Sequence, residues 1–155
     1  MLNPTKSFVL GIIAAVLALI LEVVVSLAFP EEIAAQTYFQ KFTWLLLATV
    51  LIEESLKLIF LLKISSFVEK NKLIVQGLFL GAGFGITELL LKKLFQENLS
   101  LLSLLPAFFI HLITCLIASF ILSKQAKFSK LKSFSILALI SLIHLIYNLL
   151  IIYFF

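Results

Sequence analysis

Aspartate and arginine are both absent from this 155-residue chain, and cysteine occurs once, as Cys115. Without aspartate, the chain cannot be a membrane protease that works through two aspartates. Without arginine, no guanidinium group can pair with the cysteine. A single cysteine forms neither an internal disulfide nor a cysteine-rich zinc site, so we expect Cys115 to be a small apolar core residue.

Two catalytic signatures are missing as well. The chain contains no His-Glu-x-x-His, the pattern with which one helix face binds zinc, and no Gly-x-Ser-x-Gly. Ser26, Ser119 and Ser141 have no base beside them in the sequence. Polar chemistry in this protein is therefore left to glutamate, histidine, lysine and asparagine.

Charged residues make up only 13% of the chain, whereas 63% of the residues are hydrophobic and the mean hydropathy is +1.21. A soluble domain is roughly 45–50% apolar. Five apolar runs approach the length of about 20 residues that crosses a bilayer as a helix. The sequence therefore predicts an all-α, polytopic membrane bundle. Its five spans are expected at residues 8–29, 42–62, 73–91, 101–122 and 134–155.

The whole chain is expected to form one transmembrane domain. Within it, residues 42–155 would form a core of four spans, and residues 1–41 an additional N-terminal span and loop. The first apolar run follows Lys6 as in a signal peptide, but it exceeds the roughly 7–15 apolar residues of such peptides and contains Glu22. We therefore interpret it as a retained helix, and Glu22 could be either structural or functional.

All twelve positive charges are lysines, and most of them lie at predicted helix ends. This placement argues against nucleic acid as a partner and for a lipid bilayer. One face holds Lys6, Lys63, Lys70, Lys72, Lys124, Lys127, Lys130 and Lys132, whereas the other holds Lys41, Lys92 and Lys93. The positive-inside rule then predicts a cell-membrane protein with a cytoplasmic N-terminus and an external C-terminus.

Glu53, Glu54 and Lys57 stand in the middle of the second predicted span. Each charge at the centre of a span costs roughly 2.5–3.5 kcal/mol, and each surrounding apolar residue offsets only roughly 0.3–0.6 kcal/mol. Such charges face a partner or a cavity and are candidates for a functional site. Because Glu53 and Lys57 are four residues apart on one helix face, a purely structural ion pair between them is the alternative.

Further polar residues stand in each of the three later spans: Glu88, His111, His144 and Asn148. At about 1.5 Å per residue from the outer helix ends, Glu53, His111 and His144 all lie roughly 15–17 Å deep. Glu88 and Asn148 lie roughly 8–9 Å deep on the same count. The shared depth predicts one polar site at mid-membrane that opens toward the outer face.

Gly77, Gly81 and Gly85 recur every four residues in the third span, which predicts a stripe where a neighbouring helix packs closely. Glu88 lies seven residues after Gly81 and so on the same side of the helix. We expect this stripe to turn Glu88 into the bundle and away from lipid.

These residue types suit hydrolysis by an activated water molecule. A buried glutamate can take a proton from water, a histidine can position that water, and an asparagine amide can donate to the developing oxyanion. Alternatively, His111, His144 and either Glu53 or Glu88 could bind zinc and leave one position open for water. The sequence leaves both versions open.

Four motifs in consecutive spans resemble the PrsW family of intramembrane proteases, within the CAAX-protease and bacteriocin-processing superfamily. They are Glu53-Glu54-x-x-Lys57, Phe84-x-x-x-Glu88 after Gly-Ala-Gly83, a single His111, and His144-x-x-x-Asn148. The wider superfamily has arginine where Leu58 stands and phenylalanine where Ala107 stands, which favours PrsW over processing of prenylated proteins.

The resemblance implies a glutamate-dependent endopeptidase that cleaves membrane-anchored proteins near the outer face. Glu53 and Glu54 would be the catalytic pair, supported by Lys57. Glu88 and His111 would complete the water or metal site, and His144 with Asn148 would form the oxyanion side. Two other functions stay open: a catalytically silent relative that binds membrane proteins, and a small proton-coupled transporter.

Overall fold

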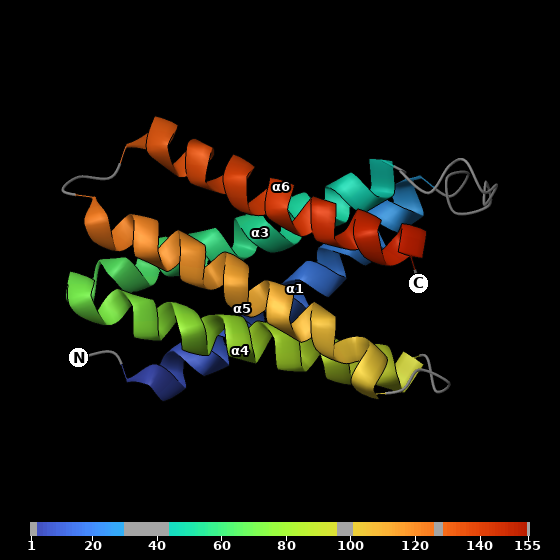
Figure 1. Cartoon of the computed structure of the whole chain (residues 1–155), viewed down its shortest axis with the longest axis horizontal. Coiled ribbons are helices and arrows are strands. Elements are labelled where there is room, and N and C mark those ends of the chain that lie inside the picture. Colours follow the sequence, from blue (N-terminus) through green and yellow to red (C-terminus); the bar gives the residue numbers. More distant parts are fainter. Residues whose placement is uncertain (1–2, 30–43, 96–100, 126–128, 155) are drawn as a thin grey trace.

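The computed structural model describes residues 3–29, 44–95, 101–125 and 129–154, and within these ranges it contains helices and no strand. The predicted all-α bundle is therefore confirmed (Figure 1). Its helices are α1 (Pro4–Ala28), α3 (Trp44–Ser65), α4 (Lys70–Phe95), α5 (Leu101–Lys124) and α6 (Lys130–Phe154).

Helix α1 shows how local sequence sets a helix start. The side chain of Asn3 accepts a hydrogen bond from the Thr5 amide at 3.1 Å, and Pro4 occupies the first turn. Asparagine at this cap satisfies a free backbone N–H, and proline has no N–H there to leave unpaired. Helix α1 therefore begins at Pro4, two residues before Lys6.

Four helices are long and apolar enough to cross a membrane: Pro4–Ala28, Lys70–Leu94, Leu105–Lys124 and Lys130–Tyr153. Helix α3 is the exception, because it carries Glu53, Glu54 and Lys57 near its middle. These three side chains are buried in the bundle. The neighbouring helices therefore keep the charged side chains of α3 out of contact with lipid, as an intramembrane charge requires.

The glycines allow α4 to pack closely on two neighbours. Gly77, Gly81 and Gly85 face α5, and a Cβ atom added to Gly81 would lie 2.8 Å from the carbonyl oxygen of His111. This confirms the predicted packing stripe. On the other side of α4, Gly83 faces the backbone of α1 at Phe8. Since no Cβ fits at these contacts, both neighbours approach the backbone of α4 directly.

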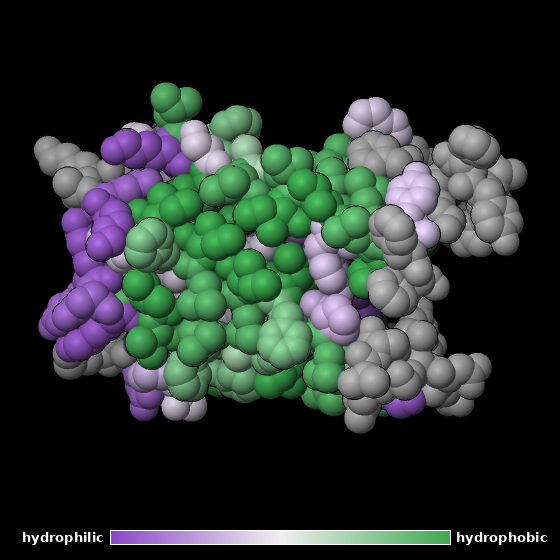
Figure 2. Space-filling view, in the orientation of Figure 1, coloured by the Kyte–Doolittle hydropathy of each residue, from purple (hydrophilic) through white to green (hydrophobic). Residues whose placement is uncertain are grey.

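The apolar core fills the half of the bundle that lies near the lysine-rich end. It contains Cys115, as predicted, beside Leu58, Leu61, Ile64, Leu73, Leu80, Ala118, Leu122, Ile136 and Ile140. Figure 2 shows the hydrophilic residues gathered at that end and a broad hydrophobic belt beside them. The buried glutamates and histidines lie outside this apolar cluster.

Helix α1 belongs to this bundle by its packing. Ala14, Ala15 and Ala18 form a second small core with Phe84 of α4. Ser7 of α1 donates a buried hydrogen bond of 2.5 Å to Gln76 of α4. The division into a four-span core and an additional first span stays a prediction, but α1 contributes both apolar and polar contacts to α4.

Candidate functional site

A cavity of about 480 Å³ opens between the five helices of the described residues. Its polar lining consists of Glu22, Thr49, Glu53, Glu88, Lys92, His111, His144, Tyr147 and Asn148. These residues lie in the last parts of α1, α4 and α6 and the first parts of α3 and α5. Because successive helices alternate in direction, all these parts lie at one end of the bundle, opposite the lysine-rich end (Figure 1).

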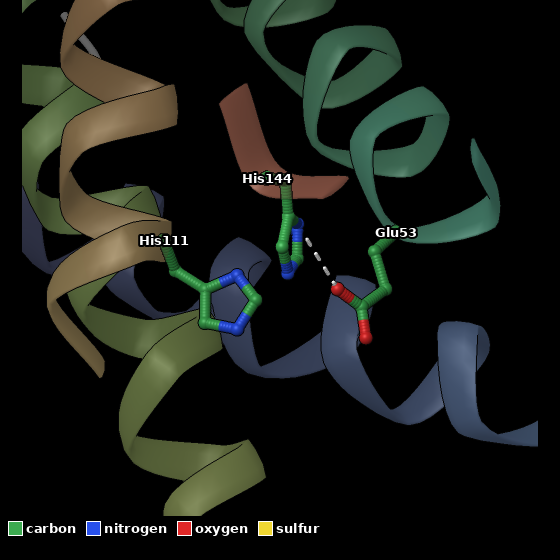
Figure 3. A group of neighbouring side chains, drawn as sticks. All are labelled: Glu53, His111 and His144. Carbon is green, nitrogen blue, oxygen red and sulfur yellow. Dashed lines mark ion pairs between the residues drawn. The ribbon is translucent and has the colours of Figure 1, made fainter. Parts of the chain in front are cut away.

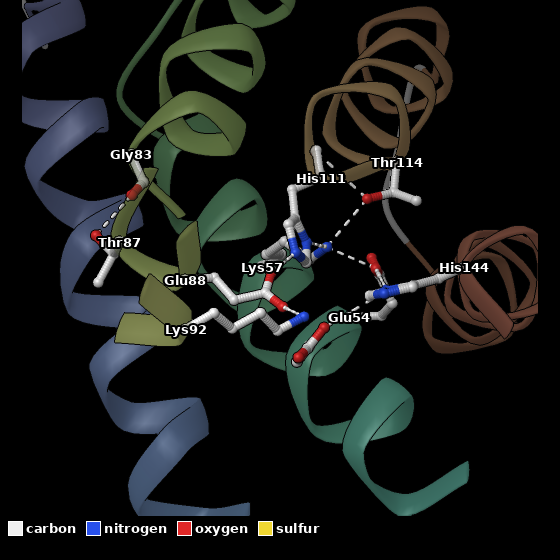
Figure 4. Close-up of polar contacts among 10 residues, drawn as sticks. Glu54, Lys57, Gly83, Thr87, Glu88, Lys92, His111, Thr114 and His144 are labelled. Atoms are coloured by element: carbon white, nitrogen blue, oxygen red, sulfur yellow. Dashed lines mark hydrogen bonds and ion pairs between the residues drawn. The ribbon is translucent and has the colours of Figure 1, made fainter. Parts of the chain in front are cut away.

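The ammonium group of Lys57 lies at the buried, inner end of the site (Figure 4). Its ammonium lies 2.5 Å from Glu54 Oε1, 3.0 Å from His111 Nδ1 and 3.0 Å from Thr114 Oγ1. An ammonium group has three N–H donors and no acceptor, so each donor has one partner here. Lys57 therefore connects α3 to the histidine and the threonine of α5.

This arrangement determines which nitrogen of His111 carries the proton. Since Lys57 can only donate, Nδ1 of His111 accepts, and the neutral ring must carry its hydrogen on Nε2. That nitrogen contacts Oε2 of Glu88, whose other oxygen is ion-paired with Lys92. Both ring nitrogens of His111 are therefore occupied: Lys57 contacts Nδ1, and Glu88, which lines the cavity, contacts Nε2.

His144 is held at one nitrogen only. Its Nδ1 lies 2.6 Å from Glu54 Oε1 and 3.5 Å from Glu53 Oε2. A carboxylate accepts, so Nδ1 carries the hydrogen and Nε2 keeps a lone pair. Figure 3 shows the two imidazole rings and the Glu53 carboxyl group turned toward a common space. The Glu54 carboxylate thus orients His144 in the way that an acidic residue orients a catalytic histidine.

Glu53 and Glu54 are adjacent in sequence but have different surroundings. Glu54 is fully buried and binds Lys57 and His144, whereas Glu53 lines the cavity. Oε2 of Glu53 is buried and has no hydrogen-bond partner in the described part of the chain. A buried acceptor of this kind calls for an explanation such as a water molecule or a ligand. The side chain that faces the cavity with a free oxygen is therefore Glu53.

The predicted metal ligands do lie together. Glu53, His111 and His144 can each offer one ligand atom, and these atoms lie within 4.8 Å of one another. A coordinating nitrogen must be unprotonated, and that condition suits His144 but not His111, whose Nε2–H points to Glu88. As these hydrogen bonds stand, the donor set fits a water molecule better than a metal ion, and zinc stays a prediction.

The structure brings the predicted site residues to one place: Glu53, Glu54, Lys57, Glu88, His111 and His144 form one group, and Asn148 lines the same cavity. The alternative ion pair between Glu53 and Lys57 is wrong, because Lys57 pairs with Glu54. Spacings of three and four residues both put side chains on one helix face. The packing of the neighbouring helices determines whether Lys57 pairs with Glu54 or with Glu53.

Five contributors were not predicted as site residues: Glu22, Thr49, Lys92, Thr114 and Tyr147. Glu22 carried a signal, because it is the only acidic residue in α1. Lys92 was interpreted only as a charge that sets membrane orientation. Thr114 follows His111 by three residues, a spacing that places both on one face of α5.

No protein-family model, curated protein or solved structure matches this chain. The fold and the site define its class: an all-helical membrane protein with a buried group of glutamates, histidines and lysine beside a cavity. The resemblance to the PrsW family therefore depends on the four motifs.

Proposed function

We propose that this protein is an intramembrane endopeptidase of the PrsW type. It would hydrolyse a peptide bond of a membrane-anchored protein with a water molecule held between Glu53 and His144. The observation that carries the proposal is the free, buried oxygen of Glu53, which faces a cavity beside two oriented imidazole rings. A carboxylate in this position can take a proton from water as a general base.

The hydrogen bonds support separate roles for the two histidines. His144 offers the lone pair of Nε2 to the water, because Glu54 holds its Nδ1–H. This differs from the predicted oxyanion role, which needs a donor. Asn148, one turn further along α6 and also in the cavity lining, carries the amide N–H groups that can donate to a carbonyl oxygen. His111 fixes Glu88 and, through Lys57, Glu54.

The cleavage of single-span peptides in proteoliposomes tests this function. Each peptide in a panel would carry a fluorophore on one side of the outer end of its membrane-spanning segment and a quencher on the other side. We expect the wild-type protein to separate them, and His144→Phe, which keeps a ring but loses both nitrogens, to be slower by about 100-fold or more. Leu142→Phe is the control, since Leu142 is an exposed residue of the same helix.

Wild-type protein that cleaves no peptide of the panel, or a His144→Phe variant as fast as the wild type, would contradict the proposal. Co-purification of a stoichiometric membrane partner without any cleavage would instead favour the silent, partner-binding relative.

The proposed orientation places the cavity on the external side of the cell membrane. The exposed lysines at the opposite end, Lys63, Lys70 and Lys130 among them, would then face the cytoplasm. We expect a membrane-impermeant maleimide added to intact cells to label Leu94→Cys, at the cavity end, and not Phe67→Cys, at the lysine-rich end. Both positions are exposed, whereas Cys115 is buried. Labelling in the reverse pattern would overturn the orientation.

A further inference from the structure

Two of the four glutamates in the site form an ion pair with a lysine, and two do not. Glu54 is ion-paired with Lys57, and Glu88 with Lys92. Within the described residues, neither Glu22 nor Glu53 forms an ion pair with a lysine.

These two remaining glutamates come from different helices and meet in the cavity. Glu22 of α1 and Glu53 of α3 both line it. Neither carboxyl group is ion-paired with a lysine of the described residues, so two carboxyl groups without a paired lysine share one cavity. Two ionised carboxylates offer only acceptors, so a hydrogen bond between them requires one proton. Two carboxyl groups in one cavity without a lysine partner are expected to share one proton, because two negative charges at close range repel each other.

Placing the carboxyl group of Glu22 in an apolar span costs free energy, and this cost requires an explanation. The span around it is the most apolar of the four, with a mean hydropathy of 3.0. A charged residue in such a span faces a cavity or a partner and marks a functional place more often than an anchor. Packing alone does not call for an acidic side chain here, because the α1 residues of the nearby core are alanines.

We propose that Glu22 and Glu53 form the acid–base pair of the site and that Glu22 is a catalytic residue. This inference rests on the proposed protease function. Paired carboxyl groups that share one proton are an established solution for hydrolysis by water, in which one group acts as base and the other as acid. The first helix, and not only the second span, then supplies the reacting carboxyl groups.

The steps balance as follows. Glu53 takes one proton from water while the water oxygen bonds to the peptide carbonyl carbon. Glu22 gives its proton to the carbonyl oxygen as the C=O π bond opens, which leaves a neutral gem-diol. The C–N bond then breaks, Glu53 gives its proton to the leaving nitrogen, and one hydroxyl proton of the gem-diol returns to Glu22. The pair ends with one proton, as it began.

Glu22→Gln separates this role from a structural one. Glutamine keeps the size and the hydrogen bond of the protonated carboxyl group but cannot transfer a proton. With the fluorogenic peptides, we expect kcat to fall by about 10²–10⁴-fold, with KM and the melting temperature unchanged. Glu69→Gln, at an exposed position outside the cavity, is the matched control and is expected to behave as the wild type.

A second measurement needs no substrate. Infrared spectra of the purified protein with ¹³C-labelled glutamate should show the carbonyl band of a protonated carboxyl group. We expect Glu22→Gln and Glu53→Gln each to remove that band, and Glu69→Gln to keep it. A band that survives in Glu22→Gln, or a Glu22→Gln protein that cleaves at the wild-type rate, overturns the inference. If the band depends on both residues but the wild type cleaves nothing, the shared proton is supported and the protease function fails.

Discussion

Lys57→Met is expected to lower the free energy of unfolding by about 3–5 kcal/mol, the usual effect of removing one partner of a buried ion pair. Glu54 would keep its charge in the interior with only His144 as a donor. His111 Nδ1 and Thr114 Oγ1 would lose the donor that satisfies them. Denaturation in mixed detergent, followed by the helical circular-dichroism signal, would measure the loss.

The control for this prediction is Lys72→Met. Lys72 forms an ion pair of 3.2 Å with Glu69, also three residues away, but both side chains are largely exposed. Exposed pairs contribute roughly 0–1 kcal/mol, so Lys72→Met should unfold nearly as the wild type does. Equal losses in the two variants would show that Lys57 is not buried and paired as described.

Combining Lys57→Met with Glu54→Gln should restore part of the lost stability, because the double variant no longer carries the Glu54 charge that Lys57→Met leaves without its lysine. We expect the double variant to stay inactive all the same. Without the Glu54 carboxylate, His144 loses the acceptor that orients its ring. Stability and activity would thus respond differently to the same pair of residues.

Glu53→Gln is expected to lower kcat by about 10²–10⁴-fold. Glutamine cannot take the proton from water. The folded protein should be at least as stable as the wild type, because the substitution removes a buried carboxylate that has no lysine partner. Turnover of the fluorogenic peptides and the detergent unfolding curve would measure the two effects.

The adjacent Glu54 provides the contrast. Glu54→Gln should lower both activity and stability, since Lys57 and His144 both lose a charged acceptor. Glu69→Gln again serves as the control with neither effect. A Glu53→Gln protein with wild-type turnover would remove Glu53 from the mechanism. A Glu54→Gln protein of unchanged stability would contradict its place in the buried ion pair.

Much of this site could be predicted from the sequence because polar residues in apolar spans are costly and therefore rare. The chain carries only two histidines and no aspartate, so few candidates existed for a buried polar group. That Glu53, His111 and His144 lie close together was predictable as well, since a helix rises by about 1.5 Å per residue and the three residues stand at similar distances from their helix ends. The glycine stripe of α4 likewise predicted the side that faces α5, and thereby the inward position of Glu88.

The helical fold, the apolar runs and the set of intramembrane polar residues followed from the sequence by itself, because helix period and transfer cost are local properties. Only the tertiary structure decided that Lys57 pairs with Glu54, that His144 keeps a free nitrogen, and that Glu22 lines the same cavity as Glu53. Those outcomes depend on how five helices rotate and pack against one another. Neighbouring positions on one helix, such as Glu53 and Glu54, receive different partners once that packing is set.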